Sequence, residues 1–168
     1  VVKAVEAVNT MQKERVIDHL NVCFSSLKGK TIAVLGIAFK PNTDDVRESS
    51  ALVIIDRLLE EGAAIRAFDP EVSDVKGYDS KSVTFVGNSY EAAEGADVIL
   101  LVTEWHAFRE LDLKKLRSVM KTPVFVDLRN TEYYIVHQTS KEIPLTIGVT
   151  RNHAYRSPEL GQIFLALV

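Results

Sequence analysis

Hydrophobic positions along the chain fall into short aliphatic and β-branched runs that alternate with segments of helical spacing. Such runs predict strands at residues 31–39, 63–68, 82–86, 97–102 and 123–127. Apolar residues at three- and four-residue spacing predict helices between them, at residues 51–59, 89–93 and 111–120. About five strands alternating with helices indicate an α/β fold with a Rossmann-like, doubly wound parallel sheet.

A long N-terminal helix is expected to precede this sheet. Apolar residues recur at three- and four-residue spacing from Val1 to Leu20, and Gly29 follows as the expected C-terminal breaker. A helix with this stripe must bury it against the domain, another domain or another subunit. The helical pattern begins abruptly and without an initiator methionine, which leads us to expect a fragment of a longer protein.

The pattern divides the chain into three parts. Residues 1–28 are the helix, residues 29–130 are the α/β domain, and residues 131–168 form a tail without a clear organisation. Apolar runs at 133–136 and 145–149 in that tail are compatible with strands.

Composition narrows the class of protein. Hydrophobic residues make up 46% and charged residues 26% of the 168 positions, as in ordinary globular proteins. The net charge of -3 argues against a nucleic acid partner, because phosphate backbones select basic faces. The apolar run at 98–102 is far shorter than the roughly 20 residues of a spanning helix. Cys23 is the single cysteine, so no internal disulfide forms and a cytoplasmic protein is expected.

A charged loop follows the first predicted strand, and it carries the most specific chemistry in the sequence. Lys40 carries a compact ammonium charge, and Arg47 carries a planar guanidinium that can donate two parallel hydrogen bonds. This combination suits a phosphate-bearing ligand. Asp44 and Asp45 are positioned to orient these cations or to accept hydrogen bonds from sugar hydroxyls. A solvated turn with capping residues and surface cations is an equally good interpretation of the spacing.

Polar clusters follow three of the predicted strands, at residues 40–47, 103–106 and 127–130. In open α/β sheets, ligands bind at the carboxyl ends of the strands, so the clusters should meet at a ligand site. Arg129 is either a third ligand cation or the structural partner of a nearby acid. Trp105 suits stacking on a ligand, although packing beneath a loop is the commoner role, and His106 is expected at the surface.

The dinucleotide fingerprint is missing. Only Gly36 stands where G-x-G-x-x-G would be, and bulky Ile37 and Phe39 follow it. Asp69 ends the second strand much further along than the roughly 20 residues typical of a ribose-binding acid. The sequence shows neither metal-ligand spacing nor a nucleophile elbow, and Cys23 has no basic neighbour that would activate it, so we expect it packed or at an interface.

The segment Gly36-Ile-Ala-Phe-Lys-Pro-Asn-Thr-Asp-Asp-Val-Arg-Glu-Ser-Ser50 resembles the UDP-glucose 6-dehydrogenases, members of the wider UDP-glucose/GDP-mannose dehydrogenase family. The resemblance covers residues 1 to about 130. Five further segments support it: Val8-Asn9 with Gln12-Lys13, Phe68-Asp-Pro70, Val102-Thr-Glu-Trp105, Phe108-Arg-Glu-Leu-Asp112 and Val126-Asp-Leu-Arg-Asn130.

The resemblance implies the two-step oxidation of UDP-glucose to UDP-glucuronate with two NAD, in a protein whose missing N-terminal domain binds NAD. It implies that Phe39, Lys40 and Arg129 bind the nucleotide sugar and that Arg47 reaches the NAD. The catalytic cysteine of the family lies in a Gly-Gly-Ser-Cys motif, which is expected upstream of this chain. Cys23 does not match that motif.

The resemblance also implies a homodimer that pairs through the first helix. Two alternatives stay open at this stage. One is a sibling dehydrogenase acting on GDP-mannose or a UDP-N-acetylhexosamine. The other is a non-catalytic nucleotide-sugar-binding or dimerisation module.

Overall fold

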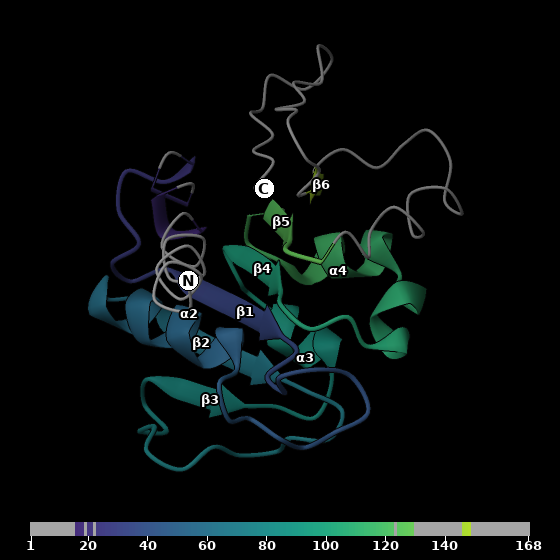
Figure 1. Ribbon diagram of the computed structural model, residues 1–168. Coiled ribbons are helices and arrows are strands. Elements are labelled where there is room, and N and C mark those ends of the chain that lie inside the picture. Colours follow the sequence, from purple (N-terminus) through teal and green to yellow (C-terminus); the bar gives the residue numbers. More distant parts are fainter. Residues whose placement is uncertain (1–15, 19, 22, 123, 130–145, 149–168) are drawn as a thin grey trace, which may run out of the picture.

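The computed structural model describes residues 16–18, 20, 21, 23–122, 124–129 and 146–148 (Figure 1). The described residues between 16 and 23 are helical, which agrees with the end of the expected first helix. Val16, Ile17 and Leu20 of this segment are buried in the core of the domain. The start of that helix and nearly all of the tail beyond residue 129 lie outside the described residues.

A six-stranded parallel sheet forms the centre of the described structure, with the strand order β3-β2-β1-β4-β5-β6. The strands are β1 (Thr31–Leu35), β2 (Ala64–Phe68), β3 (Val83–Phe85), β4 (Val98–Leu101), β5 (Val124–Asp127) and β6 (Thr146–Gly148). This is the Rossmann order, in which the topology reverses between β1 and β4. The α/β fold class with a Rossmann-like parallel sheet is therefore confirmed, whereas the long helix before it stays a prediction. β6 extends the sheet past residue 130, the expected end of the α/β domain.

Four helical segments connect the strands: α2 (Ser50–Glu60), α3 (Ser89–Ala93), the 3-10 helix η1 (His106–Glu110) and α4 (Leu113–Val119). Ser49 caps α2, because its hydroxyl accepts the N–H of Ala51 and donates to the carbonyl of Ile37. Asp112 caps α4 by accepting the N–H of Lys115, which is why this helix begins at 113 and not at 111 as predicted.

The two central strands are fully covered. Every residue of β4 is buried, as are residues 32–35 of β1. Their continuous apolar sequences are typical of parallel strands with covered faces. The hydrophobic core therefore fixes the ends of β1 and β4 with respect to each other.

β1 ends at Leu35, four residues before the predicted end of the run. Gly36 adopts φ +90°, and a Cβ at this position would lie 2.6 Å from Cβ of Thr103. Ile37 and Ala38 stay buried, but their N–H groups bind the carboxylate of Asp69 rather than a neighbouring strand. The apolar run thus continues through a buried turn, which periodicity alone does not distinguish from a strand.

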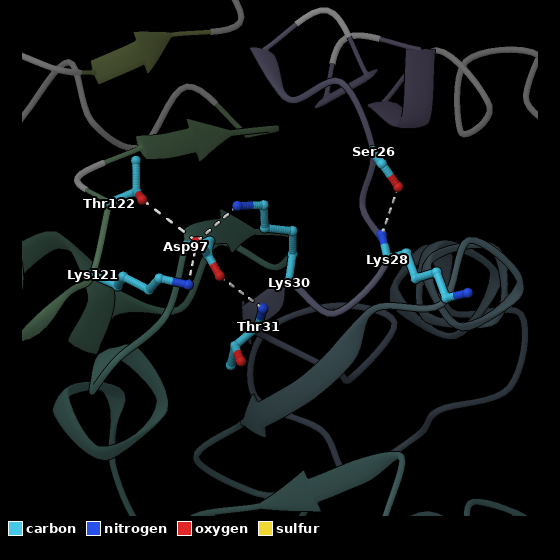
Figure 2. A network of polar contacts seen from close by, with 7 residues as sticks. All are labelled: Ser26, Lys28, Lys30, Thr31, Asp97, Lys121 and Thr122. Carbon is cyan, nitrogen blue, oxygen red and sulfur yellow. Dashed lines mark hydrogen bonds and ion pairs between the residues drawn. The ribbon is translucent and has the colours of Figure 1, made fainter.

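At the opposite, amino edge of the sheet, a buried carboxylate ties three strands together (Figure 2). Oδ2 of Asp97 accepts the N–H of Thr31 at 3.1 Å, and Oδ1 lies 3.3 Å from Nζ of Lys30 and 3.4 Å from Nζ of Lys121. These residues precede or begin β4, β1 and β5. Burial alone would raise the pKa of Asp97, but the N–H of Thr31 and the two lysines outweigh it and hold the pKa below its usual value.

Candidate functional site

The three polar clusters meet at the carboxyl edge of the sheet, as predicted. β1, β4 and β5 are neighbours, so the segments that follow them lie side by side. The hydroxyl of Thr103, after β4, donates to the carbonyl of Ala38, after β1, at 2.7 Å. Nε of Arg129, after β5, donates to the carbonyl of Val102 at 2.8 Å. These two bonds link the segments that follow β1, β4 and β5 at this edge.

The loop between β1 and α2 folds back on itself. The N–H of Phe39 donates to the carbonyl of Asp45 at 2.8 Å, which closes residues 39–45 into a compact turn. Asn42 and Glu48 take positive φ values of 61° and 59°, an uncommon conformation for residues other than glycine. Phe39 is 48% exposed and Lys40 is also exposed. The turn therefore presents an aromatic ring and an ammonium group to solvent.

Arg47 and Asp45 form a bidentate pair on this loop. Nε and Nη2 of Arg47 donate to Oδ1 and Oδ2 of Asp45 at 2.9 and 2.8 Å, and the N–H of Arg47 also donates to Oδ1. The hydrogen bonds from the Arg47 side chain and backbone lower the pKa of Asp45 to about 2, and the pKa of Arg47 is raised in turn. Of the two roles that the sequence suggested for Asp45, the structure shows the orientation of a cation.

Arg129 is held where β5 ends beside β4. Its N–H donates to Oδ1 of the buried Asp127 at 2.7 Å, while its Nε binds the carbonyl of Val102. The residue as a whole is exposed. The structure thus shows a structural contact with a nearby acid, and the role of Arg129 as a ligand cation stays a prediction.

Asp69 is the feature that sequence reasoning missed. It is 5% exposed, and its carboxylate accepts five N–H groups. Oδ2 accepts from Ile37, Ala38 and the indole of Trp105 at 2.7, 2.9 and 3.0 Å, while Oδ1 accepts from Glu71 and Val72 at 2.9 and 3.1 Å. Its place in a Phe-Asp-Pro segment at a strand end was the only sequence signal.

Three further residues singled out from the sequence are Trp105, His106 and Cys23. Trp105 is 6% exposed and bound to Asp69, which favours the packing role over ligand stacking. The side chain of His106 is 82% exposed, as expected. Cys23 is exposed among the described residues, and its expected place in packing or at an interface stays a prediction. Desolvation by nearby atoms raises the pKa of its thiol, which disfavours the reactive thiolate.

The described residues contain no cluster of three or more His, Cys, Asp or Glu side chains that would hold a metal ion. None of the described helices is long and apolar enough to cross a membrane.

The strand order, with exposed cations in the segments after β1 and β5, is typical of a Rossmann-like domain, here without the glycine-rich dinucleotide turn. Residues 33–132 match the UDP binding domain of the UDP-glucose/GDP-mannose dehydrogenase family. The chain belongs to this family, in agreement with the resemblance that its motifs suggest.

Relatives agree with this assignment. UDP-glucose 6-dehydrogenase of Pseudomonas aeruginosa is 41% identical over 137 residues, which are 77% of this chain and 30% of the relative. A UDP-glucose dehydrogenase from Pyrobaculum islandicum is similar in structure, with a TM-score of 0.67, 32% identity, and coverage of 79% of this chain and 29% of that one. UDP-D-ManNAc dehydrogenase from Pyrococcus horikoshii superposes with a TM-score of 0.60 at 25% identity, covering 83% and 29% of the two chains. The chain thus spans about a third or less of the length of these relatives.

Proposed function

We propose that this chain is the sugar-nucleotide half of an NAD-dependent UDP-glucose 6-dehydrogenase, which oxidises UDP-glucose to UDP-glucuronate with two NAD. The observation that carries the proposal is that the segments after β1, β4 and β5 are linked at one carboxyl edge, where Phe39, Lys40 and Arg129 are exposed. Family membership supports it, as do relatives with about 40% identity that are UDP-glucose 6-dehydrogenases.

In this proposal the exposed groups of the edge bind the nucleotide sugar. The ammonium of Lys40 and the guanidinium of Arg129 pair with its diphosphate, and the exposed ring of Phe39 packs against the ligand. Arg47 keeps 87% of its side chain exposed while its guanidinium is paired with Asp45, which suits contact with NAD held by another domain. A cation that touches a ligand across a domain cleft would couple closure of the cleft to binding.

The chemistry itself needs groups beyond this chain. Each of two NAD molecules, when bound in turn, would accept one hydride from C6 of the sugar. The nucleophilic cysteine is expected in a separate domain, since Cys23 has neither the motif nor an activating environment. The described residues serve to bind and orient the nucleotide end of the substrate.

The remaining parts of the proposal concern assembly and sugar choice. We also propose that the protein forms a homodimer through the first helix and lies in the cytoplasm. The likeness to UDP-D-ManNAc dehydrogenase keeps a UDP-N-acetylhexosamine as the second candidate substrate. A non-catalytic binding module is the competing class of function.

Calorimetry and an absorbance assay test these functions. We expect the chain alone to bind UDP weakly and to produce no NADH from UDP-glucose and NAD. The protein that joins this chain to a NAD-binding domain should produce two NADH per UDP-glucose, and less or none from other nucleotide sugars in a panel. NADH formed by the chain alone would contradict the proposal that hydride transfer needs a separate NAD-binding domain. If the joined protein binds UDP but forms no NADH, the non-catalytic binding module would be favoured.

A further inference from the structure

The carboxylate of Asp69 occupies the place where a Rossmann domain carries its ribose-binding acid, at the carboxyl end of β2. Here it faces inward. A carboxylate has about four acceptor sites, and five N–H donors already surround this one. No acceptor is left for a ribose diol, so this domain does not bind a dinucleotide in the usual way at β2.

Three separate parts of the chain supply those donors. Ile37 and Ala38 belong to the turn after β1, Glu71 and Val72 follow β2, and Trp105 lies in the loop after β4. Both Asp69 and Trp105 are more than nine-tenths buried. The hydrogen bonds therefore join the ends of three strands beneath the surface that carries the cations.

The turn held in this way leads directly to the candidate ligand groups. Phe39 and Lys40 follow Ala38 in sequence, and both are exposed. The carbonyl of Ala38 is also fixed, by the hydroxyl of Thr103. With its N–H and its carbonyl both bound to buried groups, Ala38 sets the direction in which the chain leaves the core.

We propose that Asp69 and Trp105 form a clamp that positions Phe39 and Lys40 for the nucleotide sugar. Neither clamp residue touches the ligand in this proposal; both act through the turn at Ile37 and Ala38. In this proposal Asp69, the acid at the end of β2, orders a substrate-binding loop, whereas the corresponding acid of a dinucleotide-binding domain binds the ribose of the cofactor. This inference rests on the proposed sugar-nucleotide site, but the ordering of the turn does not.

Two variants test the clamp. Asp69→Asn replaces an acceptor oxygen with a donor that faces other donors, and should weaken UDP binding at least about tenfold. Trp105→Phe keeps an aromatic ring and removes one hydrogen bond; we expect a loss of about threefold to tenfold. UDP affinity is measured by calorimetry well below the thermal midpoint of each variant.

A matched control separates positioning from stability. Asp97→Asn alters another buried carboxylate that accepts a backbone N–H, but at the amino edge of the sheet. It should lower stability and leave UDP affinity unchanged. Hydrogen exchange gives a second measurement: Trp105→Phe should speed exchange at the amides of Ile37 and Ala38 more than in β4, whereas Asp97→Asn should not single out these two amides.

The outcomes distinguish the clamp from the proposed function. If the unaltered chain binds UDP and both clamp variants bind it equally well, the clamp does not position the site. If the unaltered chain fails to bind UDP, the proposed function fails, and exchange at Ile37 and Ala38 alone decides whether the clamp orders the turn. If Asp69→Asn does not fold, UDP affinity and hydrogen exchange are both measured on Trp105→Phe. The inference is overturned if this variant changes neither the UDP affinity nor the exchange at Ile37 and Ala38.

Discussion

Lys40 is exposed at the carboxyl edge and carries the charge that the proposal places on the diphosphate. Lys40→Ala should weaken binding of UDP-glucose by about 1.5–3 kcal/mol, the usual contribution of a charged hydrogen bond. Calorimetry on the intact enzyme measures the loss. Lys81→Ala is the control, because Lys81 is an exposed lysine that precedes β3 at the opposite edge. Unchanged affinity in Lys40→Ala would remove Lys40 from the site.

A second prediction concerns the ion pair between Asp45 and Arg47. Because the hydrogen bonds of Arg47 lower the pKa of Asp45 to about 2, the pair should persist at every pH above about 3. In Arg47→Ala, the pKa of Asp45 should return toward its ordinary value of about 3.9. Carboxyl NMR signals followed during an acid titration report both values. Identical midpoints in the two proteins would show that the pair does not form in solution.

Individual residues differ in how far the sequence reveals them. Lys40, Arg47 and Arg129 stand in a family motif or at a strand end, so their place at one edge could be predicted. Asp69 could not, because its carboxylate accepts only backbone and indole N–H groups, and three of the five come from distant segments. Backbone partners leave no pattern of residue types along a chain.

Helix α2 provides a prediction at the scale of an element. Ser49→Ala removes the cap of the helix and the hydroxyl that donates to the carbonyl of Ile37 at 2.6 Å. The free energy of unfolding should fall by about 1–3 kcal/mol. Urea denaturation measures it. Ser50→Ala, in the first position inside the helix, should change stability little; equal losses from the two variants would contradict the assignment of the cap to Ser49.

Helices and strands with a regular spacing of apolar residues were predicted well, and those that end in buried turns were not. The sequence located α2, β2 and β4 to within one or two residues, since their apolar positions fit one period. β1 was extended by four residues because Ile37 and Ala38 are apolar and buried without being in a strand. Short strand β6 was one of two open possibilities in the tail, because three residues carry too little pattern to decide.

At the scale of the whole molecule, Asp97 ties β1, β4 and β5 together at the amino edge. Its pKa is lower in the folded state than in an unfolded chain, so its charged form stabilises the fold. This contribution is complete above the unfolded value of about 3.9 and disappears as the pH falls through the lower folded value. Stability should therefore decline below about pH 4.

Asp97→Asn tests that linkage. The variant should lose about 2 kcal/mol at pH 7, because the backbone N–H of Thr31 and two lysines lose their anionic partner. The difference from the unaltered chain should shrink as the pH falls below about 4. Urea denaturation across this range measures both proteins, and a difference that stays constant with pH would exclude Asp97 as the titrating group.

Trp105 is the one tryptophan in the sequence, and it lies within the clamp. The protein therefore carries its own fluorescent label beneath the proposed substrate loop. Emission from selectively excited tryptophan arises from a single place, where the indole N–H binds a buried carboxylate. A ligand that shifts the turn at Ile37 and Ala38 would alter that emission, so occupancy of the site can be followed in real time without attaching a dye.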